Sequence, residues 1–354
     1  MKKIKSLGYD VVFEDNLNEL QSFLIDHDYS QLLILVDRNT NDHCLPVLQA
    51  AIPDIVDYDI IEVDPGEENK NIDFCIGVWK TMLDFGADRK ALMLNLGGGV
   101  VTDMGGFAAA TYKRGIDFIN VPTTLLSQVD ASVGGKTGID LDNVKNIIGT
   151  FSQPQAVFIS TAFLKTLDDR QIRSGFAEII KHGLIQDKAL YEKCKSLELP
   201  AVPNEIVFES VQIKNNVITI DPKEKGLRKI LNFGHTIGHA IEGYSLENDQ
   251  LPLLHGEAIA IGMICEAYLS FKLNNLEEAE LEEIVQYLSS VYPKYQFDQS
   301  IYPILLGLMR NDKKNENNQL GFSLLRSIGD CDFNKYVEEA DIIESLDYYR
   351  NLNS

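Results

Sequence analysis

Three of the six histidines in the chain have the spacing of metal ligands. His235 and His239 are four residues apart in a segment with helical character, so both imidazole rings would project from one helix face. His255 follows a polar, turn-like segment (245–250) that would let a second helix fold back toward the first. Because imidazole nitrogens are common ligands of zinc, the spacing predicts a zinc-like site. Such a pair also occurs by chance in ordinary helices, and that interpretation stays open at this point.

A run of three glycines is typical of a turn that binds phosphate groups. Residues 97–99 follow the strand-like segment 91–96 and precede a helix-like segment. Glycines let the backbone approach a ligand closely, and the N–H groups at a helix start suit a pyrophosphate. The run is not the GxGxxG pattern of many dinucleotide-binding domains. Asp37 ends another strand-like segment (32–37), where its carboxylate could bind a ribose or an adenine edge, or could belong to an ordinary surface turn.

Polar side chains that could reach a ligand are unusually frequent between residues 100 and 151. Any one of them could be a solvated loop residue. The basic members carry more weight, because cations gathered in a cleft of an acidic protein can attract an anionic substrate such as a phosphate. The candidates in this segment are Asp103, Arg114, Thr123, Thr124, Asp130, Lys136, Lys145 and Asn146.

Further charged residues belong to the predicted helical part of the chain. Glu178 and Lys181 are three residues apart on one helix face, and this spacing alone favours an ion pair at the surface. Lys214 and Arg228 lie in the segments that lead to the histidines. These two cations could therefore lie beside the proposed metal.

The predicted elements divide the chain into two domains, for which its 354 residues are sufficient. Strand-like segments (32–37, 56–63 and 91–96) first alternate with helix-like ones such as 72–84, which predicts an α/β domain with a largely parallel sheet. Ligands of such sheets bind at the carboxyl ends of the strands. From about residue 160, apolar residues repeat with helical spacing in the segments 169–185, 205–219, 255–273 and 276–291. We therefore expect an α/β domain over residues 1–160 and a mainly α-helical domain over residues 161–354.

The net charge of −21 argues against a nucleic-acid partner or an anionic membrane surface, so we expect small molecules or proteins as partners. The five cysteines are scattered without CxxC spacing and are expected to be reduced, packed thiols. The first residues do not have the pattern of a secretory signal, and the longest apolar runs, 32–36 and 259–265, are too short to span a membrane. We expect a cytoplasmic protein.

Six segments strongly resemble the 3-dehydroquinate synthase family of sugar-phosphate cyclases, in the family's order from about residue 32 to residue 315. They are GGGVVTDMGGF, RGIDFINVPTTLLSQVDASVGGKTGID, KNIIGTF, SGFAEIIKHGLI, EKGLRKILNFGHTIGHAIE and LHGEAIAIGM. The resemblance implies an N-terminal Rossmann-like α/β domain that binds NAD, a C-terminal mainly α-helical domain that binds a metal ion, Zn2+ or Co2+, and a homodimer.

The resemblance also implies roles for single residues. It implies that Glu178, His235 and His255 bind the metal, so that Glu178 takes the place that spacing alone gave to His239. The implied NAD-binding residues are Asp37, Glu67, Lys70, Gly98, Gly99, Val100, Asp103, Thr123, Thr124, Lys145, Phe163 and Thr166. The implied catalytic residues are Asp130, Lys181, Asn232 and His239, and the implied substrate-binding residues are Arg114, Lys136, Asn146, Lys214, Arg228, Lys313 and Lys314. Arg114 is expected to reach the active site of the neighbouring subunit.

Members of this family convert 3-deoxy-D-arabino-heptulosonate 7-phosphate, a sugar acid phosphate, into 3-dehydroquinate and phosphate in the shikimate pathway of aromatic amino-acid biosynthesis. Transient oxidation of the C5 hydroxyl by NAD acidifies the neighbouring C–H, phosphate is eliminated, the hydride returns, and an intramolecular aldol step closes the ring. Zinc bound by two imidazoles and one carboxylate keeps positions open for substrate hydroxyls. Lys136, Asn146, His239 and the pair Lys313 and Lys314 would hold the phosphate. Arg228 and Lys214 would hold the carboxylate.

Three other functions compete with this interpretation. Another sugar-phosphate cyclase is the nearest, but Arg228 and Lys214 favour a substrate with a carboxylate. A metal-dependent NAD alcohol dehydrogenase would accumulate NADH. A non-catalytic metal- or NAD-binding protein is disfavoured, because the metal ligands, the glycine turn and the anion-binding residues all occur together.

Overall fold

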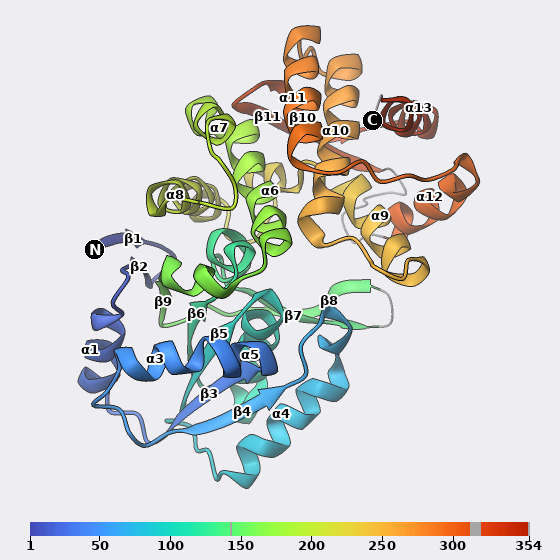
Figure 1. Cartoon of the computed structure of the whole chain (residues 1–354). Helices are drawn as coiled ribbons and strands as arrows, with labels where there is room; N and C mark the ends of the chain where they lie inside the picture. Colours follow the sequence, from blue (N-terminus) through green and yellow to red (C-terminus); the bar gives the residue numbers. More distant parts are fainter. Residues whose placement is uncertain (142–143, 312–319, 353–354) are drawn as a thin grey trace. The chain divides into compact units, whose positions relative to one another are not determined.

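The computed structural model describes residues 1–141, 144–311 and 320–352 (Figure 1). The chain forms two compact units, Met1–Asp168 and Asp169–Ser354, which we call unit 1 and unit 2. Unit 1 is an α/β unit with a largely parallel sheet and unit 2 is mainly helical, so the predicted fold class is confirmed. The predicted boundary after residue 160 falls just before the short helix η4 (Thr161–Thr166) of unit 1.

The sheet of unit 1 has seven strands in the order β1-β2-β9-β6-β5-β3-β4. All neighbouring pairs are parallel except β1 with β2. The strands are β1 (Lys2–Lys5), β2 (Asp10–Phe13), β3 (Leu32–Asp37), β4 (Asp59–Val63), β5 (Leu92–Gly97), β6 (Asp117–Pro122) and β9 (Ala156–Ile159). Strand β3, which lies between β5 and β4, is apolar on both faces: Leu33 and Leu35 belong to one core cluster, and Ile34 and Val36 to the other. This is why the sequence shows an unbroken apolar run there.

Helices cover both faces of this sheet. The core cluster on one face contains residues of α1 (Asn18–Asp26) and α3 (Leu45–Ala51), and the cluster on the other contains residues of α4 (Ile72–Asp84) and α5 (Gly99–Thr111). The hairpin of β7 (Lys136–Leu141) and β8 (Val144–Phe151) packs against α5. The remaining short elements are α2 (Arg38–His43), η1 (Glu67–Asn69), η2 (Tyr112–Arg114) and η3 (Ser127–Ala131).

The strand order places a topological switch point in the sheet of unit 1. From β3 the chain passes to β4 on one side and then to β5 on the other side of β3, which is a topological switch point. In open parallel sheets, ligands bind outside the carboxyl ends of the strands at such a point. We call this the carboxyl edge of unit 1.

Helix α10 (His255–Leu273) is the central element of unit 2. It packs against α6 (Asp169–Gln186), α9 (His235–Asn248), α11 (Glu278–Val291), α13 (Glu339–Asn351) and strand β10 (Gly321–Ser327). Two glycines permit this packing: a Cβ on Gly256 would lie 1.8 Å from the carbonyl oxygen of Ser174, and one on Gly262 would lie 1.9 Å from that of Gly234. The remaining elements are α7 (Lys188–Lys195), α8 (Asn204–Ile220), η5 (Leu227–Asn232), η6 (Gln299–Ile301), α12 (Tyr302–Asn311) and β11 (Asp330–Tyr336).

The β10–β11 hairpin was not expected from the sequence. It is antiparallel, and its turn contains Gly329 at a φ of 95°. It is fixed to α10 by side chains of that helix, because Ser270 Oγ accepts from Leu325 N (2.9 Å) and Asn274 Nδ2 donates to Leu324 O (3.0 Å). These partners lie 50 and 55 residues earlier in the sequence, at the end of α10, so no local pattern connects them with the strands.

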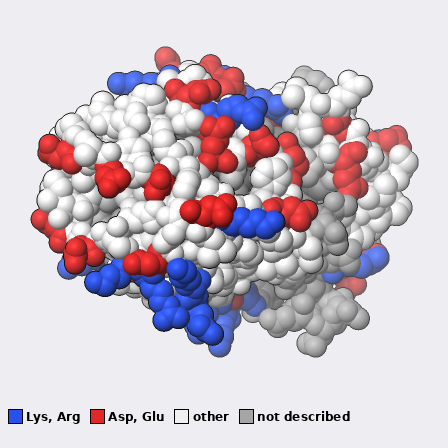
Figure 2. Space-filling model, turned by 90° about the horizontal axis from the view of Figure 1, so that it is seen from below, with Lys and Arg blue, Asp and Glu red and all other residues white. Residues whose placement is uncertain are grey.

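The distribution of charged side chains and the state of the cysteines agree with what the composition predicted. Acidic side chains are spread over the face shown in Figure 2, whereas basic side chains gather in smaller groups. All five cysteines are buried free thiols, as predicted. Among the residues that the structure describes, no helix is both long enough and apolar enough to cross a membrane.

Candidate functional site

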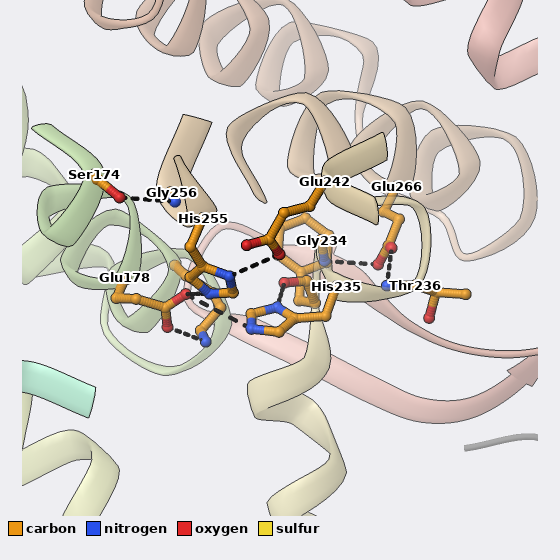
Figure 3. Close-up of polar contacts among 11 residues, drawn as sticks. Ser174, Glu178, Gly234, His235, Thr236, Glu242, His255, Gly256 and Glu266 are labelled. Carbon is orange, nitrogen blue, oxygen red and sulfur yellow. Dashed lines mark hydrogen bonds and ion pairs between the residues drawn. The ribbon is translucent and has the colours of Figure 1, made fainter. Parts of the chain in front are cut away.

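Four side chains from three helices of unit 2 converge on one point, and Figure 3 shows three of them, Glu178, His235 and His255. Glu178 comes from α6, His235 and His239 from α9, and His255 from α10. Glu178 Oε1 lies 3.6 Å from Nε2 of His235 and 3.6 Å from Nε2 of His255. The three histidines each offer a ring nitrogen within 4.8 Å of the others. A carboxylate with imidazoles is a ligand set that suits Zn2+ or Co2+.

The orientation of the rings also fits a metal site. Nδ1 of His235 lies 3.1 Å from the carbonyl oxygen of Phe233, and Nδ1 of His255 lies 3.2 Å from Oε2 of Glu242. With each Nδ1–H donated to an oxygen, the Nε2 lone pairs of both rings would be available to a metal ion bound beside Glu178. His239 lies beside them, its ring centroid 5.1 Å from that of His235. Spacing alone had grouped all three histidines, and the geometry adds Glu178 between His235 and His255.

The metal-free site holds a proton. Burial by itself lowers the pKa of His255, but the charges of Glu242 and Glu178 and their hydrogen bonds outweigh it and raise the pKa to about 9. At neutral pH the imidazolium therefore compensates for the buried carboxylates. A metal ion that takes its place must displace this proton.

Glu178 and Lys181 are not at the surface, so the preference for a surface ion pair was wrong. They are 0% and 1% exposed, and the Lys181 ammonium contacts Oε2 of Glu178 directly. Helix α6 is buried on most of its circumference, because α7, α8 and α10 pack around it. Buried charges are energetically expensive unless they are paired, so a fold retains few of them. Where they occur, they are often part of a functional site.

Two further glutamates fix the helices that carry the histidines, and sequence reasoning missed both. The buried carboxylate of Glu266 accepts hydrogen bonds from the backbone N–H groups of Gly234 (2.7 Å), Thr236 (3.1 Å) and Ile237 (3.2 Å), at the start of α9. Glu257 accepts from Leu254 N (2.8 Å) and so caps α10 at His255. These bonds satisfy N–H groups that a helix start leaves unpaired.

Arg170 reinforces the cap of α10. Its guanidinium pairs with both carboxylate oxygens of Glu257 at 2.7 Å and also donates to the carbonyl oxygen of Pro252 (2.7 Å). Together these bonds tie the first turn of α6 to residues on both sides of His255.

The predicted carboxylate-binding residues are buried on neighbouring elements. Lys214 on α8 is 5% exposed and Arg228 on η5 is 3% exposed, and these two elements pack together. The loop between them is shaped by Asp221, whose carboxylate accepts from the backbone of Gly226 (2.6 Å) and Arg228 (3.1 Å). Buried cations of this kind can recognise an anionic ligand group.

Asn232 ends the same short helix η5. Its side-chain amide donates to Oε1 of Glu224 (2.7 Å), a residue that the sequence analysis did not single out. Glu224 adopts a φ of 56°, in the left-handed region that residues other than glycine rarely occupy. Such a conformation costs free energy, which the surrounding structure must offset.

In unit 1, residues predicted to hold NAD follow the strands at the carboxyl edge. Glu67 and Lys70 come after β4, Asp37 ends β3, Gly98 to Val100 follow β5, Thr123 and Thr124 follow β6, and Phe163 and Thr166 lie on η4 after β9. A Cβ on Gly97 would lie 2.5 Å from the side chain of Val101, so this position excludes a side chain. Asp37 also caps α2, because its carboxylate accepts from Thr40 N at 2.8 Å.

Four of the predicted cofactor residues form one charged cluster. Lys70, 3% exposed, lies 2.6 Å from Asp103 and 3.9 Å from Glu67, and Lys145 lies 3.6 Å from Glu67. Burial opposes the charge on Lys70, but the nearby carboxylates outweigh it and raise the pKa of the ammonium. Asp140, which was not predicted, adds to this effect.

The other predicted residues are more dispersed. Arg114 is exposed at a φ of 72° and lies just before the amino end of β6, at the opposite edge of the sheet from Thr123. Lys136 is exposed on β7, Asn146 lies on β8 with its backbone N–H donated to Asp140 (2.6 Å), and Asp130 is half-buried on η3. Lys313 and Lys314 lie outside the described residues.

Comparison with known proteins agrees with this geometry. Residues 60–174 match the family described as 3-dehydroquinate synthase N-terminal, and residues 175–315 match 3-dehydroquinate synthase C-terminal. A 3-dehydroquinate synthase of Parabacteroides distasonis is 44% identical over 344 residues, which cover 96% of this chain and 97% of that protein.

Solved structures of sugar-phosphate cyclases share the fold over nearly the whole chain. One is a 2-deoxy-scyllo-inosose synthase complexed with carbaglucose-6-phosphate, NAD+ and Co2+ (TM-score 0.83, 25% identity, 97% of this chain and 98% of that chain). Another is the 2-epi-5-epi-valiolone synthase of Streptomyces hygroscopicus subsp. jinggangensis 5008 with NAD+ and Zn2+ (TM-score 0.83, 27% identity, 99% and 98%). The two matching family descriptions and the 44% identical relative decide between these branches, and the chain belongs to the 3-dehydroquinate synthase family.

Proposed function

We propose that the chain converts 3-deoxy-D-arabino-heptulosonate 7-phosphate into 3-dehydroquinate and phosphate, with NAD at the carboxyl edge of unit 1 and a metal ion held by Glu178, His235 and His255. The observation that carries the proposal is the convergence of Glu178 Oε1 with the Nε2 atoms of both histidines, 3.6 Å from each. When bound, the metal ion would polarise substrate hydroxyls, and NAD would take up and return one hydride.

The charged residues of unit 2 supply recognition and proton handling. Lys214 and Arg228 are buried cations that suit the substrate carboxylate, because a planar guanidinium can bind both carboxylate oxygens. His239 lies next to the ligand pair on the same helix, where its ring would hold the phosphate and leave the metal to its neighbours. Lys181 neutralises Glu178, and we assign it, Asp130 and Asn232 to positioning the reacting hydroxyls and their protons.

In unit 1, the cofactor residues divide by position. Gly98 and Gly99 begin α5, where the backbone N–H groups suit a pyrophosphate. Glu67, Lys70, Asp103 and Lys145 form the charged cluster beside it, and Thr123 and Thr124 lie at the end of the neighbouring strand. Lys136 and Asn146 of the β7–β8 hairpin, with Lys313 and Lys314, are proposed to hold the phosphate of the substrate.

Phosphate release from the heptulosonate phosphate tests this function. The purified protein, with zinc and a small amount of NAD, should release phosphate over many turnovers, and a chelator should stop the reaction. NADH that accumulates in proportion to substrate would indicate the alcohol dehydrogenase instead. Release from a hexose phosphate, but not from the carboxylated substrate, would indicate another cyclase and would contradict the role of Arg228 and Lys214.

We further propose a homodimer in which Arg114 reaches the site of the partner subunit. The proposal is supported by the place of Arg114 at the sheet edge opposite the cofactor residues of its own chain. Light scattering would give the mass of the particle. Mixing inactive Arg114→Ala and Lys181→Ala subunits should restore up to about a quarter of the wild-type activity, because mixed dimers contain one complete site. No recovery in dimers shown to exchange subunits would contradict it.

We also infer a cytoplasmic location, in keeping with the five free thiols. Fractionation of cells that express the chain would test it.

A further inference from the structure

We infer that Glu242 is a positioning residue of the metal centre, which holds the imidazole of His255 so that its Nε2 atom faces the metal. The inference rests on the proposed metal site. Glu242 lies on α9, is 5% exposed, and places Oε2 3.2 Å from Nδ1 of His255 on α10 (Figure 3). On the other side of the same ring, Nε2 lies 3.6 Å from Glu178. The ring is therefore held between two carboxylates.

The two histidine ligands are anchored in different ways. His235 has an oxygen close by in its own chain segment, since its Nδ1 lies 3.1 Å from the carbonyl of Phe233, two residues before it. His255 is the first residue of α10, and its Nδ1 is held by a side chain thirteen residues earlier on another helix. Without Glu242, the ring of His255 would be free to rotate away from Glu178.

The charge of Glu242 matters in addition to its place. An imidazole that donates Nδ1–H to a carboxylate becomes a stronger electron donor at Nε2, whereas a neutral carbonyl has a weaker effect. Removing the carboxylate should weaken metal binding even when the ring stays in place.

Two other buried glutamates of this region, Glu257 and Glu266, serve the backbone. Glu266 caps α9 and Glu257 caps α10, each by accepting backbone N–H groups at a helix start. Glu242 faces a ligand ring instead. A buried carboxylate is costly to the fold, so its place beside the ring indicates a task in the metal centre.

Zinc affinity of the full chain tests the inference. Metal-stripped wild type, Glu242→Ala and Glu242→Gln would be titrated with Zn2+ in competition with a chromophoric chelator. Glu242→Ala should weaken binding by about 10- to 100-fold. Glu242→Gln should weaken it by only about threefold to tenfold, since the amide oxygen still accepts from Nδ1–H. The matched control is Glu247→Ala, an exposed residue of the same helix, which should bind zinc as the wild type does.

A spectroscopic readout separates positioning from a general loss of stability. The visible absorption of bound Co2+ reports its ligand geometry, so the spectrum of Glu242→Ala should change and that of Glu247→Ala should not. Circular dichroism and urea unfolding of the metal-free variants show whether each is folded. If Glu242→Ala does not fold, the test rests on Glu242→Gln, whose zinc affinity should be lower than that of the wild type by about threefold or more.

The outcomes distinguish this inference from the proposed function. The role of Glu242 is overturned if folded Glu242→Ala has the zinc affinity and the cobalt spectrum of the wild type. If that variant does not fold, the same result in Glu242→Gln overturns it. Either result leaves the proposed metal site intact. If the wild type binds no zinc, or if Glu178→Ala and His235→Ala retain full affinity, the proposed metal site itself fails.

Discussion

The two candidate sites of the chain are built from different parts of its elements. In unit 1, the proposed cofactor residues lie on the turns and first helical residues that follow parallel strands. In unit 2, the proposed ligand Glu178 lies in the middle of α6 and is 0% exposed, and its partners come from two other helices. The first site therefore depends on how strand ends and turns are placed, whereas the second depends on how three helices pack in the core of its unit.

The largest effect is expected when the carboxylate ligand is removed. Glu178→Gln takes away the charge that faces both Nε2 atoms and leaves Lys181 buried without its partner. Zinc content should fall to a small fraction of one per chain, and phosphate release should fall by more than about 1,000-fold. Elemental analysis and a phosphate assay would measure both. Full zinc content in this variant would contradict the contrast between the two sites, because the metal site would then not depend on a residue in the core of unit 2.

A smaller but still large effect is expected from the cap of α9. Glu266→Gln replaces one of the two acceptor oxygens with an NH2 group, which would oppose the backbone N–H of Gly234 or those of Thr236 and Ile237. The free energy of unfolding should fall by about 2–3 kcal/mol, measured by urea denaturation of the metal-free protein. Glu247→Gln, at an exposed site, is the matched control and should stay within about 0.5 kcal/mol of the wild type. Equal stability of the two variants would show that the start of α9 holds without its cap.

The third test concerns pH. The pKa of His255 is raised from 6.5 to about 9 in the metal-free protein, because Glu242 and Glu178 outweigh the opposing effect of burial. A proton must leave before the metal binds, so zinc affinity should rise by about tenfold per pH unit between pH 7 and pH 9 and then level off. The folded state holds this proton more tightly than the unfolded chain, so the metal-free protein should lose stability as the pH rises from about 6.5 to about 9. Chelator competition and urea denaturation at several pH values would measure the two slopes. Flat slopes would mean that His255 is neutral at pH 7.

The smallest effect is expected at the glycine turn of unit 1. A Cβ on Gly98 would lie 3.0 Å from the side chain of Thr124 and beside the proposed pyrophosphate, so Gly98→Ala should weaken NAD binding by about tenfold. Zinc content should not change. Gly77→Ala on α4 is the control, because a Cβ there has open space and alanine favours the helix. Fluorescence titration would measure NAD affinity, and equal affinities in the two variants would place the pyrophosphate elsewhere.

The contrast between a site on turns after strands and a site between packed helices also explains how much could be predicted from the sequence. Local patterns were sufficient for β3, α4 and α10, whose predicted bounds match the structure, and for the turn after β5. Whether these turns bind NAD stays a prediction. The burial of Glu178 and the cap by Glu266 could not be predicted, since they depend on how α6, α9 and α10 pack. Glu266 lies 32 residues from Gly234, and no local pattern connects them.

The two close glycine contacts of α10 set a limit on engineering. Gly256 lies against the carbonyl of Ser174 and Gly262 against that of Gly234, so α10 cannot slide along α6 or α9 to accept a larger ion. Substituting either glycine to stabilise the helix would push apart the elements that carry Glu178 and His235. A change of metal preference would therefore have to come from exchanging ligands within the present backbone, and stabilising substitutions in α10 would have to spare these two glycines.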